Sequence, residues 1–151
     1  MPERDWNALV STAVHAVLET MFFTDPRGPV EPAPEVRSPL LASRLSFRGE
    51  PSGSFGVSVS MDAARQLAAG FLAENVADLT DARVEQIVCE MTNMLCGSVV
   101  STLENDQRFT LSPPELIPPE GALAAGPGGH EVARQTFALE TGSLSVLLGI
   151  F

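Results

Sequence analysis

The sequence predicts an α+β fold, in which an antiparallel sheet carries long helices packed on one face. Three observations predict it. Two long segments repeat apolar residues at intervals of three and four positions, which is the period of an amphipathic helix. Two pairs of shorter segments alternate apolar residues with small or polar ones and are joined by tight turns, as in antiparallel hairpins. The predicted order of elements, α-β-β-α-α-β-β-β, is that of a layer of helices on a layer of sheet.

The first helix and the first hairpin occupy the N-terminal part of the chain. The helix carries its apolar residues on one stripe and ends near Phe23, because the Pro-rich loop 25–39 cannot continue it. Strands 41–47 and 55–60 follow, and residues 49–53 turn the chain between them.

Two further helices are expected in the middle of the chain. Ser60 is placed to cap a short helix at its N-terminus. A longer helix then covers about residues 81–105. Its apolar face consists of Val84, Ile87, Val88, Met91, Leu95, Val99 and Leu103.

The C-terminal part is expected to complete the sheet. A short strand is predicted at residues 109–111, followed by a loop through the Pro- and Gly-rich stretch 112–130. The closing hairpin joins a strand at 132–140 to a strongly apolar strand at 144–150.

Charge and hydropathy exclude several classes of protein. The 151 residues carry a net charge of −10, from 9 arginines, no lysine and 19 acidic residues. A chain of this length is expected to form one domain, residues 1–151. Nucleic acids and anionic membranes bind clustered cations, which this sequence lacks. No apolar run approaches the roughly 20 residues that cross a bilayer, and the N-terminus shows no secretory signal. We therefore expect a cytoplasmic protein with no nucleic-acid or membrane partner.

The cysteines and histidines do not form a recognisable reactive or metal-binding pattern. Cys89 and Cys96 are separated by about 10.5 Å of helical rise, which is too far for a disulfide. We expect both to lie at the border of the core, as buried structural thiols rather than nucleophiles, and we expect His15 and His130 to lie at the surface. Their spacing matches no metal-binding motif, so the sequence predicts no metal site and no cofactor of the protein's own.

A polar stripe lies on the long helix opposite its apolar face. With roughly 100° per residue, Glu90 and Asn93 stand side by side on this stripe. Gly97 follows one turn later, where glycine costs about 1 kcal/mol of helix stability relative to alanine. Its bare backbone permits close approach, either by another element of this chain or by a partner. A chain of this length contains this Glu-Asn-Gly pattern by chance only roughly 0.03 times.

The segment 85–97, EQIVCEMTNMLCG, resembles the signature helix of the CheC/CheX/FliY phosphatases. In that family an acidic residue precedes Glu-x-x-Asn, and a small residue or glycine follows. The segment 17–23, VLETMFF, resembles the first helix of CheX-like domains. The resemblance covers most of the chain by its order of elements, and these two helices carry its specific part.

The two helices can be aligned with each other. Glu19 then aligns with Glu90, and Phe22 falls where Asn93 would be. Both helices carry Glu-x-x-Asn in the two-site members of the family, so the resemblance implies a CheX-like domain with one active helix.

The resemblance implies a protein aspartyl-phosphate phosphatase that acts on phosphorylated CheY-like receiver domains. Loose phosphoryl transfer requires mainly positioning, and the receiver is expected to supply Mg²⁺. By resemblance, Asn93 positions the attacking water and Glu90 pairs with the invariant lysine of the receiver. Further partner-binding residues are expected at Arg83, Gln86, Met94 and Gly97.

Two other interpretations stay open. The chain could be a catalytically silent module that binds a receiver or another signalling or flagellar protein, or it could be an unrelated α+β domain with a chance motif. A homodimer formed through the sheets is also expected by resemblance. Strand 144–150 could then be a pairing edge, or it could lie in the centre of the sheet.

Overall fold

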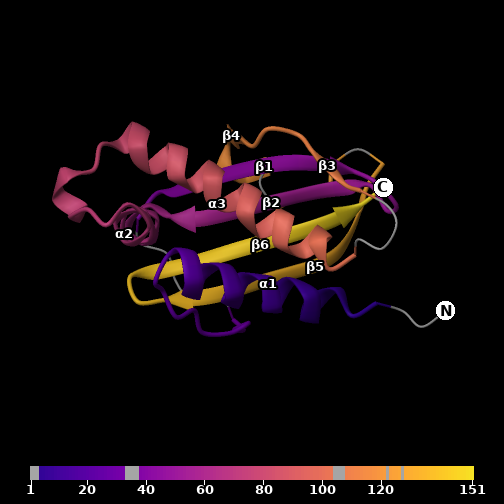
Figure 1. Ribbon diagram of the computed structural model, residues 1–151, viewed down its shortest axis with the longest axis horizontal. Helices are drawn as coiled ribbons and strands as arrows, with labels where there is room; N and C mark the ends of the chain where they lie inside the picture. Colours follow the sequence, from indigo (N-terminus) through magenta and orange to yellow (C-terminus); the bar gives the residue numbers. More distant parts are fainter. Residues whose placement is uncertain (1–3, 33–37, 104–107, 122, 127) are drawn as a thin grey trace.

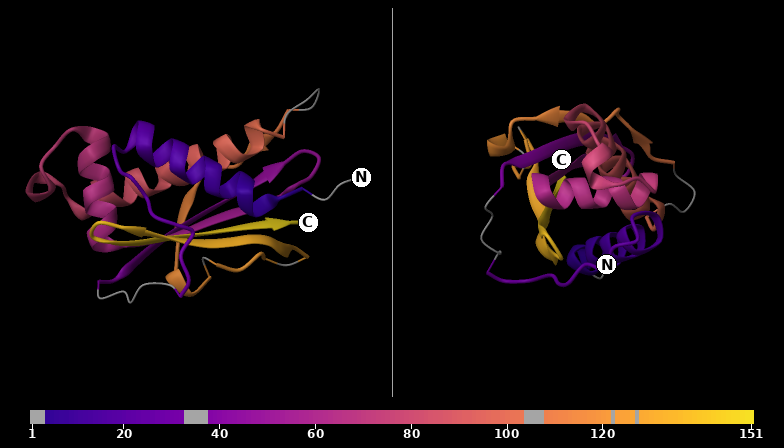
Figure 2. Two further views of the ribbon diagram at one scale, coloured as in Figure 1. Left: turned by 90° about the horizontal axis from the view of Figure 1, so that it is seen from below. Right: turned by 90° about the vertical axis from the view of Figure 1, so that its left-hand side faces the viewer.

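The computed structural model describes residues 4–32, 38–103, 108–121, 123–126 and 128–151, which form a layer of helices on an antiparallel sheet (Figure 1, Figure 2). The helices are α1 (Trp6–Met21), α2 (Met61–Leu72) and α3 (Asp81–Ser101), and two 3-10 turns are η1 (Val76–Asp78) and η2 (Pro119–Gly121). The strands are β1 (Leu40–Arg48), β2 (Gly53–Ser60), β3 (Thr110–Leu111), β4 (Glu115–Ile117), β5 (His130–Leu139) and β6 (Gly142–Ile150). The predicted α+β fold class is confirmed.

The sheet has the strand order β3-β1-β2-β6-β5, and β4 also pairs with β1. Both predicted hairpins form, β1 with β2 and β5 with β6. β2 and β6 join them at the centre of the sheet, where Val57 faces Val146 across the ladder. Two strands that lie far apart in the sequence are therefore neighbours in the middle of the sheet.

β6 is a central strand and not an edge of the sheet. It is paired with β2 on one side and with β5 on the other. Its apolar character follows from burial between two neighbours, so β6 offers no free edge to a second copy of the chain. The expected homodimer remains a prediction.

The stretch 112–130 is not only a loop, which corrects the prediction. It contains β4, whose Leu116 lies opposite Ser43 of β1, and the turn η2. A strand of three residues in a Pro-rich segment has too short a pattern to be detected by alternation. It forms because β1 presents a free edge there.

The boundaries of the two long helices also differ from the prediction. α3 ends at Ser101 rather than near residue 105, and residues 104 and 105 lie outside the described part of the chain. At this end the Thr102 hydroxyl donates to the Val99 carbonyl at 2.7 Å. α1 ends at Met21, and Phe23 takes a left-handed conformation with φ of 53°.

The helices bury one face against the sheet. α3 packs on β1 and β2, α1 packs on β5, and α2 contacts β2 and β6 (Figure 2). α1 and α3 also pack on each other. The core side chains of α3 include Val88, Met91 and Leu95, all at most 2% exposed. This packing determines which side of α3 is left facing outward.

Both cysteines are free thiols. Cys96 lies on the buried face of α3, and burial raises its pKa from 9.0 to about 12. Cys89 is only half-buried, and its Sγ lies 3.7 Å from the Ser43 hydroxyl. The prediction of a buried thiol is therefore confirmed for Cys96, while Cys89 lies at the border of the core.

The raised pKa of Cys96 predicts alkaline destabilisation. The folded state disfavours the thiolate, so the stability is fully present below the unfolded pKa of 9.0 and falls as pH rises toward 12. Between about pH 8 and about pH 10, we expect this group to lower the free energy of unfolding by about 1 kcal/mol. Urea unfolding at both pH values should show a smaller loss in Cys96→Ala. The control Cys89→Ala should retain the wild-type loss, and equal losses in wild type and Cys96→Ala would contradict the assignment.

Candidate functional site

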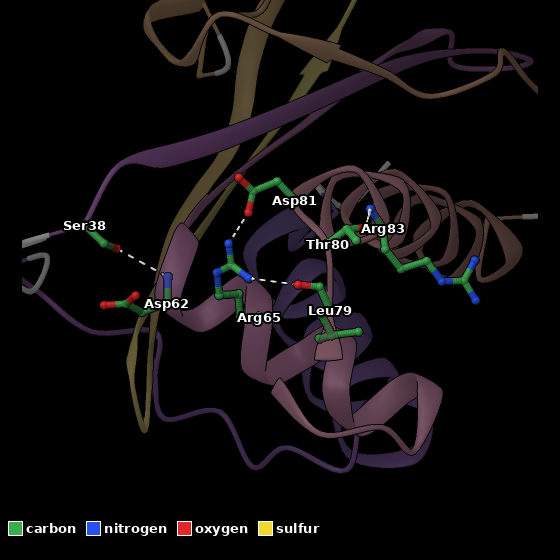
Figure 3. Close-up of polar contacts among 7 residues, drawn as sticks. All are labelled: Ser38, Asp62, Arg65, Leu79, Thr80, Asp81 and Arg83. Atoms are coloured by element: carbon green, nitrogen blue, oxygen red, sulfur yellow. Dashed lines mark hydrogen bonds and ion pairs between the residues drawn. The ribbon is translucent and has the colours of Figure 1, made fainter. Parts of the chain in front are cut away.

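The start of α3 is held by polar contacts with α2 (Figure 3). Thr80 caps the helix, and its hydroxyl accepts a hydrogen bond from the Arg83 backbone N–H at 3.1 Å. Arg65 of α2 donates to the Asp81 carboxylate and, at 3.4 Å, to the Leu79 carbonyl. These contacts join the two helices just before the candidate site. The Arg83 guanidinium extends away from them (Figure 3).

The outer stripe of α3 is exposed as the sequence predicts. Arg83, Gln86, Glu90 and Asn93 are exposed, and Met94 and Gly97 are intermediate. The structure thus brings all six predicted site residues to one face of one helix. Within this stripe the Arg83 guanidinium donates to the Gln86 side-chain oxygen at 3.3 Å.

The orientation of Glu90 and Asn93 is determined by the residues between them. Met91 and Thr92 are buried, at 1% and 0% exposure, and the Thr92 hydroxyl donates to the Val88 carbonyl at 2.9 Å. Because successive helical positions differ by roughly 100°, the burial of Met91 and Thr92 leaves the flanking Glu90 and Asn93 on the outside. The pair cannot turn inward without removing core residues.

Glu90 and Asn93 are unengaged within the described part of the chain. No hydrogen bond or ion pair from either side chain to a described residue is formed. An ionised carboxylate only accepts hydrogen bonds, whereas a carboxamide both donates and accepts. The two side chains therefore present complementary chemistry to a partner: one attracts a cation, and the other can hold water and a phosphoryl oxygen at once.

Gly97 opens the helix surface one turn after Asn93. Apart from its chain neighbours and the nearby backbone of α3, a Cβ built at this position would have no described atom within 4 Å. Tight packing by a described element of this chain is therefore not the reason for glycine here. This favours the other interpretation, in which the bare backbone permits close approach by a different molecule.

α1 does not repeat the pair. Glu19 is exposed, but Phe22 at the aligned position is 1% exposed and stacks on Phe71 with ring centroids 5.0 Å apart. An aromatic core residue thus stands where a second carboxamide would be needed. The exposed pair of a glutamate and an asparagine is therefore present on α3 and absent from α1.

The histidines lie away from α3. His15 sits on α1, half-buried, with its ring 5.8 Å from that of Phe137 of β5. His130 is exposed at the start of β5. The predicted surface position is confirmed for His130, whereas His15 is partly covered by the sheet edge.

Arg65 and Asp81 were not among the sequence-predicted site residues. They are 16 positions apart on different helices, and no local pattern links them. Only the approach of α2 to the start of α3 reveals that they support the site.

Among the helices that the structure describes, none combines the length and the apolar character that a membrane span requires.

Residues 41–138 match the model of the family described as chemotaxis phosphatase CheX. No curated protein matches the chain. Among solved structures, the chain resembles the chemotaxis protein CheX from Vibrio vulnificus, with 16% identity, a TM-score of 0.73, and 99% of this chain and 100% of that chain covered.

Two further structures share the fold. One is the CheX-CheY-BeF3-Mg complex from Borrelia burgdorferi, at 20% identity and a TM-score of 0.70, covering 95% of this chain and 96% of that chain. The other is a CheC-like superfamily protein from Shewanella sp. PV-4, at 15% identity and a TM-score of 0.74, covering 99% of both chains. The family match extends over well more than half of the sequence, including β1, β2, α2, α3 and most of β5. The chain belongs to the chemotaxis phosphatase CheX family.

Proposed function

We propose that this protein hydrolyses the aspartyl phosphate of a CheY-like receiver domain by docking the outer face of α3 onto the phosphorylated site. The observation that carries the proposal is the exposed Glu90–Asn93 pair on a helix whose rotation the core determines. Membership of the CheX family supports phosphatase activity. The Borrelia burgdorferi relative, which was solved with CheY, BeF3 and magnesium, supports the choice of partner.

Asn93 is the catalytic residue in this proposal. An aspartyl phosphate already has a good leaving group, so hydrolysis requires mainly a water in line with the phosphorus. The Asn93 carboxamide can accept a hydrogen bond from that water and donate one to a phosphoryl oxygen. Being neutral, it adds no repulsion beside an anion.

Glu90 orients the docked complex. A carboxylate would be repelled by the phosphoryl group, so its place is beside a cation. The lysine expected in the receiver's active site provides that cation, and this chain has none of its own. In the docked complex, the ion pair between Glu90 and the receiver's lysine would be shielded from water, so its strength would depend on how the two charged groups are placed. This favours one orientation of docking.

The metal for the phosphoryl transfer belongs to the receiver in this proposal. A magnesium ion on the receiver would neutralise the charge on the phosphoryl oxygens. This chain then has only to position the water and to supply the docking contacts. Arg83, Gln86 and Met94 provide further docking contacts around Glu90 and Asn93. The outer stripe offers one carboxylate beside a carboxamide, which suits that limited task.

Replacing Asn93 by alanine should slow dephosphorylation by about 100-fold or more, because the attacking water loses its positioning group. The measurement is the loss of phosphate from a phosphorylated receiver with and without the protein. Asn7→Ala, an exposed asparagine of α1, is the matched control and should leave the rate unchanged. A wild-type protein that fails to accelerate the reaction would instead support the silent binding module.

Replacing Glu90 by glutamine should weaken binding to the activated receiver, because the pair with the receiver's lysine loses its charge. Breaking a buried ion pair of this type costs about 2–5 kcal/mol. Calorimetric titration of a beryllofluoride-activated receiver measures the change. Glu140→Gln, an exposed acid in the β5–β6 turn, should bind like the wild type. Unchanged affinity in Glu90→Gln would contradict the orienting role.

Gly97→Ala separates stability from docking. The new methyl group meets no described atom of another element within 4 Å, and alanine favours the helix by about 1 kcal/mol. We therefore expect a more stable protein that binds the receiver more weakly and dephosphorylates it more slowly. Urea unfolding and the phosphate-release assay test the two halves. A variant that is more stable and fully active would show that no partner approaches closely at Gly97.

A further inference from the structure

Three potential metal ligands converge where α1 ends, away from the outer stripe of α3. His15 and Glu19 lie one turn apart on the same face of α1, and Asp25 lies in the loop that follows. One ligand atom from each of the three lies within 4.8 Å of the other two. We call these three residues the α1 cluster.

The His15 ring is oriented by a contact outside the cluster. Its Nε2 lies 3.0 Å from the Gly28 carbonyl oxygen. A carbonyl can only accept, so Nε2 carries the hydrogen. In the neutral ring, Nδ1 then holds a lone pair, and this atom lies 3.9 Å from the Glu19 carboxylate. A backbone carbonyl on one ring nitrogen is the usual support of a histidine whose other nitrogen binds a metal.

The loop that carries Asp25 is attached to the sheet. Arg27 and Ala138 of β5 exchange two backbone hydrogen bonds of 2.9 and 2.8 Å, and the Val30 N–H donates to the Thr136 carbonyl at 2.8 Å. These bonds hold the Gly28 carbonyl against His15. The cluster is therefore assembled from two supported elements, a helix packed on β5 and a loop bonded to its edge.

The two carboxylates of the cluster form no ion pair with an arginine in the described part of the chain. A ring nitrogen of His15 and the two carboxylates thus lie within 4.8 Å of one another, and the ring nitrogen beside Glu19 is Nδ1. Either a proton on Nδ1 or a bound cation would satisfy them.

We propose that the α1 cluster binds Zn²⁺ through His15 Nδ1, Glu19 and Asp25. Zinc takes imidazole nitrogen and carboxylate oxygen at about 2.0–2.2 Å, which separates tetrahedral ligands by about 3.3–3.6 Å. The three atoms lie within 4.8 Å of one another, and the exposed side chains of Glu19 and Asp25 are free to move closer to a bound ion. Calcium requires 6–8 oxygen ligands, and magnesium prefers oxygen alone, so one imidazole with two carboxylates fits zinc better than either of these ions. Three protein ligands leave a fourth position for water.

The site would connect the end of α1 to the loop on β5. Its residues are separate from the Glu90–Asn93 pair, so metal binding does not depend on the proposed phosphatase function. The prediction from sequence patterns that no metal site exists would then be wrong. Asp25 reaches the cluster only through the path of the loop, which no spacing motif records.

Titration of the full chain with Zn²⁺ by calorimetry tests the proposal. We expect one zinc ion per chain, and affinity at least about 10- to 100-fold weaker in His15→Gln and in Asp25→Asn. His130→Gln, which removes the other histidine, should bind like the wild type. The midpoint temperature of thermal unfolding should rise with added zinc in the wild type and in His130→Gln, and it should not rise in Asp25→Asn. Asp25→Asn keeps the shape of an exposed side chain, so it separates lost binding from lost folding.

Nitrogen NMR of the ring supplies the second measurement. Added zinc should shift Nδ1 of His15 and leave Nε2 as the protonated nitrogen. No binding by the wild type, or equal binding by a folded Asp25→Asn, would overturn the proposal. A spectrum in which Nδ1 stays protonated in excess zinc would also overturn the proposal. It would identify the cluster as a histidine–carboxylate ion pair. None of these readouts depends on phosphatase activity.

Discussion

The burial of one face of α3 against the sheet is the constraint on which the rest of the structure depends. Val88, Met91, Thr92 and Leu95 are all at most 2% exposed, and they leave the helix one rotational position. A rotation of α3 that hid Asn93 would expose several of these side chains, and Val88, Met91 and Leu95 each contribute about 1.5–3 kcal/mol when fully buried. The polar pair is therefore presented by the core itself and needs no lid or loop to hold it outward.

Helical periodicity was sufficient to predict this rotation, and strand alternation was sufficient to predict the two hairpins. Both are local properties of the chain, with periods of about 3.6 and 2 residues. The central position of β6 was not predictable in the same way, since an apolar strand suits either a buried edge or the middle of a sheet. β4 was missed because three residues carry no measurable period. It owes its existence to the free edge of β1.

The long-range polar contacts were equally outside the reach of local patterns. Arg65 and Asp81 meet only because α2 turns back to the start of α3, and Asp25 meets His15 only because its loop is bonded to β5. The six residues of the outer stripe, by contrast, lie on one helix, so the spacing of the sequence already placed them together. Site residues on one element are predictable from sequence, whereas sites assembled from several elements require the fold.

The account rests on the outer face of α3 entering a receiver's phosphorylated site. A crystal structure of this protein bound to a beryllofluoride-activated, magnesium-loaded receiver tests that claim most directly. We expect the Asn93 amide within hydrogen-bond distance of the in-line water position, with Glu90 paired to the receiver's lysine. A receiver docked on another face, with the Glu90–Asn93 pair still in solvent, would contradict the account.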